Sequence, residues 1–518
     1  MIGLALLLAG LGGEASYVDA SVRVDGTLLD WHFVDVEGDG KNELGVAIRT
    51  PRGRRELHLF RTSPTSIERE PYRKIPILDD IIAWTFADVR PDLAGRELVL
   101  LTRLGAWSFD PRKTGYRDNI AKLCETELLY DVPSPRALPY WSYVVEGGRN
   151  GDALLLPQRT GFSIYGPVER ASDDALPFGP IATFRAPREM TPIDPEDVQR
   201  RQDEAQRNSE RRSERFSLTI GDAFRPFLGR EVGESLVDDS VRLQAPAFVD
   251  LDGDGRRDML LLDGDRLSVH MASADGIPER PTRVETLPDY LRHDERRAAL
   301  RLVDIDGDGR EDVLGVWNEE TDAIENGQWR IYVMRATKDA LLPAKPTQVL
   351  RFEAGTLYAT VADVDGDGRP DLALRNFDFP SMIDTVTGIE FRYSQLLYLG
   401  TKRGVFDRRP ALKKERVYDE ESVQQIISKK VLQLDCSGDG IADLVEVDLY
   451  GRVGVRRLRR DSSLFGGTTW QLDDGYWKQY ASRGSVDSLQ VVDLNGDGLG
   501  DIVSASSSVL AIYLSKRR

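Results

Sequence analysis

Short apolar stretches recur along the chain, and polar segments rich in glycine separate them. In one unit, residues 247–249 (AFV) and 259–262 (MLLL) flank an acidic segment. Residues 267–271 (LSVHM) then alternate between apolar and polar side chains, and residues 282–286 (TRVET) form a fourth extended stretch. Runs of this length and period are typical of β-strands, with Gly- and Asp-rich turns between them. The pattern therefore predicts a repeated unit of four short strands.

The acidic segment is the part of the unit that repeats most clearly. It reads DLDGDGRRD in its best-formed copy, and most copies begin 53 to 59 residues after the previous one. A period of this size is typical of repeat architectures with one supersecondary unit per repeat. The clear copies are residues 35–43, 250–258, 304–312, 363–371, 435–443 and 493–501, and degenerate copies begin at Asp88 and Val144.

Repeated four-stranded units predict an all-β fold, a β-propeller with antiparallel blades. Counting both degenerate copies gives eight blades, and seven is the alternative if one of them is not a blade. After the last acidic segment, the chain supplies only two strands, at residues 501–505 and 509–514. An extra stretch at about residues 20–24 precedes the first copy, and its pairing with the last blade would close the ring and remove an exposed edge.

Two regions are expected to lie outside the regular propeller, which is otherwise a single domain over residues 16–518. Residues 1–15 contain an apolar run and small residues, and they are interpreted as a signal peptide, with a first buried strand as the alternative. This predicts a secreted, periplasmic or cell-surface protein without a transmembrane segment. An insertion at about residues 187–239 is highly charged, and its Asp194-Pro195-Glu196-Asp197 start favours an exposed helix or a partner-binding arm.

The acidic segments have the composition of calcium-binding loops. Acids stand at positions 1, 3, 5 and 9, glycines at positions 4 and 6 permit a sharp turn, and the carbonyl of position 7 can add a ligand. Calcium accepts many oxygen ligands with flexible geometry, whereas soft metals prefer Cys and His. An EF-hand is excluded because helices and a Glu at position 12 are missing in most copies. We therefore predict about five calcium sites, with a sixth in the first copy as an open possibility and none in the degenerate copies.

The predicted ligand positions are Asp35, Glu37, Asp39, Lys41, Glu43, Asp250, Asp252, Asp254, Arg256, Asp258, Asp304, Asp306, Asp308, Arg310, Asp312, Asp363, Asp365, Asp367, Arg369, Asp371, Asp435, Ser437, Asp439, Ile441, Asp443, Asp493, Asn495, Asp497, Leu499 and Asp501.

Charge and composition narrow the functional classes. The formal net charge of −17 argues against a nucleic-acid partner, because phosphate contacts need clustered Lys and Arg. The chain has only four histidines, and they do not cluster. Of its two cysteines, Cys436 stands where other copies have an apolar residue, so we expect a buried thiol rather than a disulfide to Cys124.

The repeated loop in its β context resembles the FG-GAP family, which is integrin-α-like and also includes VCBS-type repeats. This resemblance implies calcium-binding loops in propeller blades and a non-enzymatic module for binding, adhesion or scaffolding, with an unknown protein or glycan as its partner. The alternative is a calcium-dependent polysaccharide lyase or hydrolase on the same fold. The sequence leaves the oligomeric state, the ligand and a purely structural role in an envelope assembly open.

Overall fold

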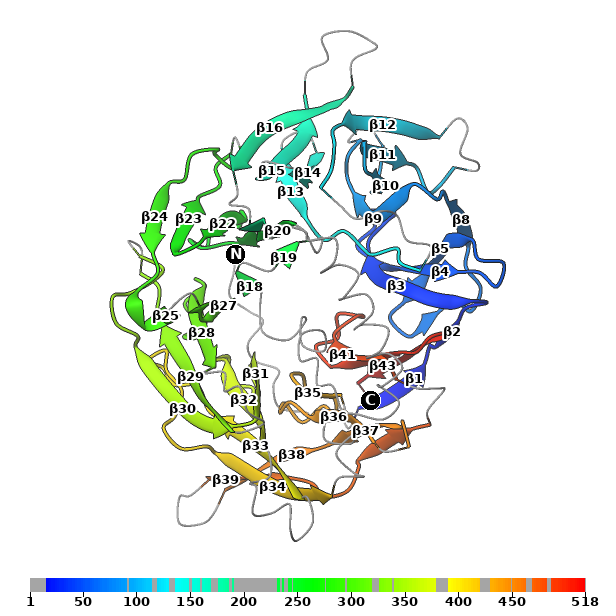
Figure 1. Cartoon of the computed structure of the whole chain (residues 1–518). Coiled ribbons are helices and arrows are strands. Elements are labelled where there is room, and N and C mark those ends of the chain that lie inside the picture. The colour runs from blue at the N-terminus through cyan, green and yellow to red at the C-terminus, as the bar shows by residue number, and fades with distance from the viewer. Residues whose placement is uncertain are drawn as a thin grey trace, which may run out of the picture.

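The computed structural model describes residues 15–517 except 91–92, 114–118, 130–135, 149–150, 159–160, 169–175, 186–188, 191–230, 233–234, 237–240, 245, 275, 294–295, 319–325, 338–339, 379–389, 420–428, 449, 463–467 and 482–485. The predicted leader up to residue 14 and the predicted insertion helix lie outside the described residues. Eight antiparallel four-stranded sheets stand around a central axis, which makes the chain an eight-bladed β-propeller (Figure 1).

Blades 1 to 4 follow one another in chain order, each with its first strand nearest the axis. Their strands are β3 (Thr27–Val34), β4 (Glu43–Arg49), β5 (Arg55–Phe60) and β8 (Arg73–Ile77); β9 (Ile81–Ala87), β10 (Glu97–Thr102), β11 (Gly105–Phe109) and β12 (Ile120–Glu125); β13 (Val144–Gly148), β14 (Gly151–Gln158), β15 (Gly161–Pro167) and β16 (Phe178–Arg185); and β21 (Ala247–Val249), β22 (Asp258–Asp263), β23 (Arg266–His270) and β24 (Arg283–Thr286).

Blades 5 to 8 continue the ring in the same way. Their strands are β27 (Ala299–Val303), β28 (Asp312–Asn318), β29 (Gly327–Met334) and β30 (Gln348–Ala354); β31 (Thr356–Ala362), β32 (Asp371–Asp378), β33 (Glu390–Tyr398) and β34 (Leu412–Asp419); β35 (Lys430–Leu432), β36 (Leu444–Val447), β37 (Val453–Arg456) and β40 (Lys478–Tyr480); and β41 (Ser488–Val492), β42 (Asp501–Ala505), β43 (Val509–Lys516) and β1 (Ser16–Asp19).

The N-terminal strand closes the ring, as predicted. Strand β1 pairs antiparallel with β43, and β2 (Val22–Arg23) continues along the same strand. The pairing starts at Ser16, several residues earlier than the sequence pattern indicated. The hydroxyl of Tyr17 donates to the carbonyl oxygens of Cys436 at 2.9 Å and Gly500 at 2.8 Å, so the closing strand is also fixed to blades 7 and 8.

Among the described residues, eight hydrophobic clusters fill the spaces between neighbouring blades, one for each pair, and a ninth, small cluster around Phe377 and Tyr393 lies within blade 6. Strand β22 shows how one strand serves two clusters. Met259 and Leu261 pack toward blade 3, whereas Leu260 and Leu262 pack toward blade 5. Because a strand inside the ring is covered on both faces, it reads as a continuous apolar run rather than an alternating one.

Several short elements lie outside the four main strands of each blade. They are the pairs β6 (Thr62–Ser63) with β7 (Ser66–Ile67), β25 (Arg292–His293) with β26 (Arg296–Arg297) and β38 (Leu458–Ser462) with β39 (Thr468–Leu472), the short strands β17 (Glu189–Met190), β18 (Glu231–Val232), β19 (Ser235–Leu236) and β20 (Val241–Gln244), and the 3₁₀ turn η1 (Asp289–Leu291). At the edges of the predicted insertion, β17 and β19 pair with β20, and β18 adds to blade 5 beside β27.

Two sequence expectations need comment here. The degenerate copy placed at residues 144–152 is not a loop, because β13 and β14 fill most of it and form a hairpin. Blade 3 is nevertheless present, so the count of eight is correct. Both cysteines are buried and free, as expected. No helix among the described residues has the length and apolar character needed to cross a bilayer.

Candidate metal-binding loops

Each clear copy of the acidic segment connects the first strand of a blade to the second. The glycines at positions 4 and 6 adopt positive φ in all six copies, for example +73° at Gly307 and +83° at Gly309. An L-residue avoids this region because its Cβ approaches the following carbonyl oxygen. The glycines therefore make the tight turn that the sequence predicted.

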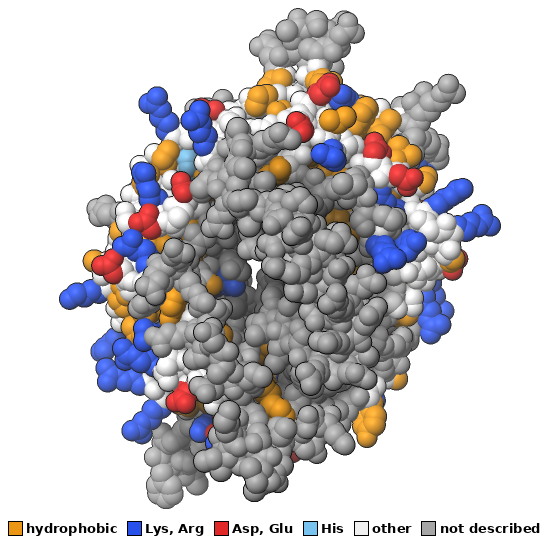
Figure 2. Space-filling view, in the orientation of Figure 1, with side chains coloured by type: hydrophobic (Ala, Val, Ile, Leu, Met, Phe, Trp, Pro, Cys, Tyr) orange, Lys and Arg blue, Asp and Glu red, His pale blue; other side chains and the backbone are white. Residues whose placement is uncertain are grey.

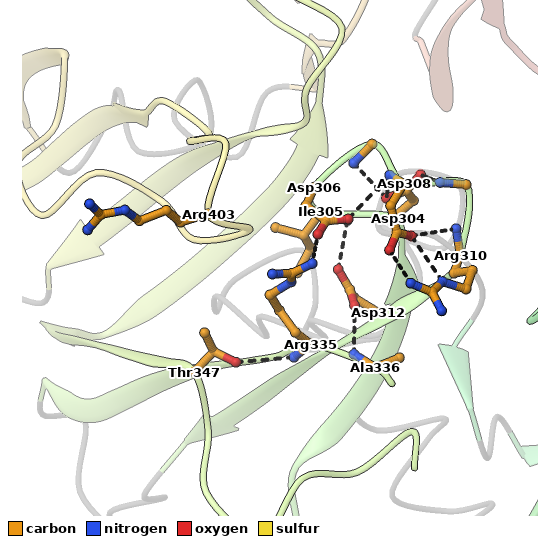
Figure 3. A network of polar contacts seen from close by, with 12 residues as sticks. Asp304, Ile305, Asp306, Asp308, Arg310, Asp312, Arg335, Ala336, Thr347 and Arg403 are labelled. Carbon is orange, nitrogen blue, oxygen red and sulfur yellow. Dashed lines mark hydrogen bonds and ion pairs between the residues drawn. The ribbon is translucent and has the colours of Figure 1, made fainter. Parts of the chain in front are cut away.

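Backbone N–H groups surround the acid at position 1. In blade 5, Oδ1 of Asp304 accepts hydrogen bonds from the N–H groups of Gly307 at 2.7 Å and Asp308 at 3.1 Å (Figure 3). Its Oδ2 accepts one from Gly309 at 2.8 Å. The other five clear copies repeat the bonds from positions 4 and 6, as Asp250 and Asp363 illustrate. The first carboxylate thus folds the loop around itself.

The acid at position 9 joins the loop to the rest of its blade. Oδ2 of Asp312 accepts from the N–H of Ile305 at 3.2 Å, and its Oδ1 accepts from Ala336 at 2.7 Å, just beyond β29. Asp258, Asp371 and Asp501 repeat both bonds in blades 4, 6 and 8. This acid therefore ties the loop to both the second and the third strand of the blade.

The folded loops bring acidic side chains together in three consecutive blades. In each of these blades, three carboxylates offer oxygen atoms that lie within 4.8 Å of one another, a spacing that can hold a metal ion. The groups are Asp250, Asp252 and Asp254; Asp304, Asp306 and Asp308; and Asp363, Asp365 and Asp371. Position 9 belongs to the group only in blade 6, and position 5 only in blades 4 and 5.

Burial makes the position 9 carboxylates of blades 5, 6 and 7 unfavourable as bare anions. Burial and the neighbouring acids raise the pKa of Asp312 to about 6, although its hydrogen bonds oppose the shift. The pKa of Asp371 is raised to about 6 and that of Asp443 to about 7, in both cases chiefly through burial. One oxygen of Asp443 is buried without a hydrogen-bond donor among the described residues. A hard cation with oxygen ligands would relieve both costs, so the donor set fits calcium.

The family described as FG-GAP-like repeat matches residues 250–315 and 304–374, which span the loops of blades 4, 5 and 6. The chain carries FG-GAP-like repeats. The resemblance inferred from the loop sequences is thereby confirmed for this part of the chain. No curated protein sequence matches the chain.

Several solved structures are similar to this chain at low sequence identity. A lectin from Agrocybe aegerita that recognises non-reducing terminal N-acetylglucosamine is 12% identical, with a TM-score of 0.35, over 79% of this chain and 90% of that chain. BBS1N, in a complex with ARL6DN, is 10% identical, with a TM-score of 0.33, over 96% of both chains. The Tc holotoxin pore of Photorhabdus luminescens is 13% identical, with a TM-score of 0.26, over 86% of this chain and 21% of that chain. TM-scores this low do not show a shared fold, so the propeller assignment rests on the strand pairing within this chain.

The acidic loops of blades 1, 7 and 8 fold in the same way but lack a group of three acids at that spacing within the described chain. In blade 8, Oδ1 of Asn495 accepts from the N–H of Asp497 at 3.0 Å, and its amide nitrogen donates to the carbonyl oxygen of Ser515 at 2.9 Å. The amide therefore replaces a carboxylate and leaves its oxygen on the side of the loop. In blade 1, Glu43 takes the position 9 role by accepting from the N–H of Val36 at 2.8 Å.

Position 7 residues were predicted to contribute backbone carbonyl groups, and that remains a prediction. Their N–H groups donate to the position 5 carboxylate in all six clear copies, as at Arg310 and Ile441. Where position 7 is basic, its side chain forms an ion pair with the same carboxylate, at 2.6 Å between Arg310 and Asp308. The pairs in the other loops join Lys41 to Asp39, Arg256 to Asp254 and Arg369 to Asp367.

In the two degenerate blades, acids form ion pairs with arginines, an arrangement that the sequence pattern did not predict. In blade 2, Arg112 Nη2 lies 3.1 Å from the fully buried Glu97, and Arg112 Nε lies 2.7 Å from Asp110. In blade 3, Glu146 lies 3.1 Å from Arg96 of blade 2 and 3.7 Å from Arg257 of blade 4. The sequence contained one related signal, because Arg90 stands at position 3 of the blade 2 copy, and its charge also opposes the raised pKa of Glu97.

The loops of neighbouring blades are also hydrogen-bonded to each other. The N–H at the end of one loop donates to a carbonyl oxygen at position 1 or 2 of the preceding loop, for example from Gly500 to Asp435 at 2.7 Å and from Ala442 to Val364 at 2.8 Å. The pairs between blades 1 and 2 and between blades 2 and 3 show the same link. These hydrogen bonds therefore connect the backbone of one loop directly to the loop of the next blade.

Proposed function

We propose that this protein is a calcium-stabilised β-propeller that acts as a non-enzymatic binding or scaffold module outside the cytosol. The observation that carries the proposal is the convergence of three acids in each of three consecutive loops. FG-GAP-like repeats, which these loops match, often bind calcium. An eight-bladed ring with such repeats supports a binding or scaffold role in general, and the narrower statements are our inference.

Calcium would act here as a structural ligand. Bound in a loop, it would neutralise carboxylates that now lie close together and whose charge is offset only in part by backbone N–H groups and by the position 7 arginines. A site at ten times its dissociation constant contributes about 1.4 kcal/mol. Five such sites would add about 7 kcal/mol, which is comparable to the net stability of a whole domain.

The location follows from the same reasoning. Extracellular calcium modules commonly have dissociation constants of roughly 0.1 to 1 mM, a range that suits calcium-rich compartments. The apolar leader pattern at the start of the sequence agrees with export. We therefore place the protein in the secreted, periplasmic or cell-surface class.

The partner is proposed to be a protein or a glycan and not a nucleic acid. Figure 2 shows Lys, Arg, Asp and Glu side chains interspersed along the rim of the ring, with no single sign over the described part of this face. The loop acids are engaged by backbone N–H groups, so their role is to fold the loop rather than to transfer protons. This supports a non-enzymatic role.

The decisive experiment measures metal content and thermal unfolding of one sample after dialysis against EDTA, calcium or magnesium. We expect about five bound calcium ions and a calcium-specific rise in melting temperature. Magnesium at equal ionic strength is the control, because it requires a stricter octahedral geometry. Equal melting temperatures in all three buffers, with no bound calcium, would contradict the proposal.

A further inference from the structure

The loop of blade 5 differs from its neighbours at position 3. Asp306 is half-buried, with only 8% of its side chain exposed, and it forms an ion pair with Arg335. Arg335 follows directly after β29, the third strand of the blade. Figure 3 shows Arg335 and Arg310 approaching the acids from opposite sides of the loop. The blade 5 loop thus contains a second guanidinium that comes from outside the repeat motif.

The hydrogen bonds of the position 9 acids identify the equivalent residue in other blades. The bond from the third-strand side is donated by Ala272, Ala336, Gly400 and Ser515 in blades 4, 5, 6 and 8. The residue just before each donor is Met271, Arg335, Leu399 and Leu514, respectively. Three of the four are apolar, so Arg335 is a departure from the pattern and not part of it.

Arg335 is held in this position by its surroundings. Its N–H donates to Oγ1 of Thr347 at 3.3 Å. Gly404 lies against its side chain, and a Cβ at Gly404 would come within 2.6 Å of Arg335 Cδ and 3.1 Å of Asp306 Cβ. A side chain at Gly404 would therefore push the arginine away from its present position beside Asp306. The contact is therefore a built feature of the interface between blades 5 and 6.

We propose that Arg335 is a tethered cation that competes with calcium for the blade 5 loop. This loop is then the weakest calcium site of the three consecutive blades, and it stays ordered when calcium is scarce. The proposal rests on the calcium role given under Proposed function, and it goes further by assigning one residue that sets the affinity of one site.

The physical reason is that the Asp306 carboxylate cannot hold its ion pair with Arg335 and at the same time bind a calcium ion at full strength. If Asp306 is to be a calcium ligand, Arg335 must give up its ion pair or remain at short range from a divalent ion of the same sign, and both are unfavourable. The side chain of Arg335 is 37% exposed, so one side of it faces solvent, into which it can turn if calcium takes its place. Blade 2 shows a comparable arrangement, because there Arg112 forms an ion pair with the buried Glu97.

The test follows hydrogen–deuterium exchange of the full chain as a function of calcium concentration, with separate peptides covering residues 250–258, 304–312 and 363–371. In the wild type we expect the 304–312 loop to be the most protected of the three in EDTA, and to gain its further, calcium-dependent protection at the highest calcium concentration of the three. Arg335→Leu, which copies blades 6 and 8, should lower that midpoint about tenfold and change the other two less than twofold. Arg335→Lys keeps the charge and should stay near the wild type.

Arg403→Leu is the matched control, because it removes the same charge nearby from a side chain that points away from Asp306 (Figure 3). It should move the 304–312 midpoint less than twofold. Thermal unfolding gives an independent readout: Arg335→Leu should lower the melting temperature in EDTA but increase the rise that calcium produces, whereas a merely structural role lowers both.

The outcomes separate the two proposals. If the blade 4 and blade 6 loops respond to calcium but Arg335→Leu leaves the blade 5 midpoint unchanged, the competition is refuted and the calcium role stands. A shift of all three loops together would also refute it, because that pattern indicates general destabilisation. If none of the loops responds to calcium, both proposals fail.

Discussion

Blades 2 and 6 each contain a buried acid, but they differ in the source of the positive charge beside it. Both place a buried acid at the end of the connection between their first and second strands, Glu97 in blade 2 and Asp371 in blade 6. In blade 2 the counter-charge is Arg112, which is part of the chain. In blade 6 three acids converge, and we propose that a diffusible ion supplies the charge. A tethered cation is always present, whereas a diffusible one makes stability depend on the surroundings.

We expect the largest effect from replacing the buried acid at position 9 of the blade 6 loop. Asp371→Asn removes a proposed ligand and leaves an amide where the N–H groups of Gly400 and Val364 need acceptors. We expect a loss of about 3 kcal/mol in unfolding free energy in millimolar calcium, and a smaller loss in EDTA. Denaturant unfolding in both buffers measures it. Glu415→Gln, on an exposed part of the same blade, should change stability by less than about 0.5 kcal/mol. An equal loss in both buffers would argue against metal binding in this loop.

The second prediction concerns the arginine that forms an ion pair with the buried acid of blade 2. Burial raises the pKa of Glu97 to about 7, against the opposing influence of Arg112. A raised folded pKa means that the stability linked to this group is present below its usual pKa of 4.5 and is lost as the pH rises through about 7. Arg112→Met removes the neutralising charge, so we expect it to cost about 2 kcal/mol at pH 8 and clearly less at pH 5.

The control for this second variant is the buffer. Because the charge in blade 2 is tethered, unfolding curves of Arg112→Met should show the same loss in EDTA and in calcium. A loss that calcium repairs would mean that blade 2 also binds the ion and that the contrast between the two blades is wrong.

The smallest expected effect concerns the turn that all clear copies share. Gly255 has a φ of +84° and open space around its missing Cβ, so Gly255→Ala introduces backbone strain without a clash. We expect a loss of about 1 kcal/mol. Gly475 also has open space but no positive φ, and Gly475→Ala should be nearly neutral in the same thermal unfolding experiment. Equal effects at both glycines would show that the left-handed turn does not matter for the loop.

The sequence by itself determined the repeat and the loop. The strand periods around residues 250–258 gave β21 to β24 nearly to the residue, because a strand buried on both faces needs an uninterrupted apolar run. The spacing of acids and glycines predicted the turn in all six clear copies, because the turn depends on local backbone geometry, whereas a close group of three acids forms in three of these loops among the described residues. Ring closure was also predictable, since the last blade lacked one strand.

Only the tertiary structure decided which charges meet across blades. Arg335 is separated from Asp306 by two strands in the chain, and Glu146 meets arginines from both neighbouring blades. These pairs depend on the angle and distance at which sheets pack, which no local pattern encodes. The same is true of the hydrogen bonds between successive loops. Residue spacing thus fixed each loop, and the packing of blades fixed which cation stands beside it.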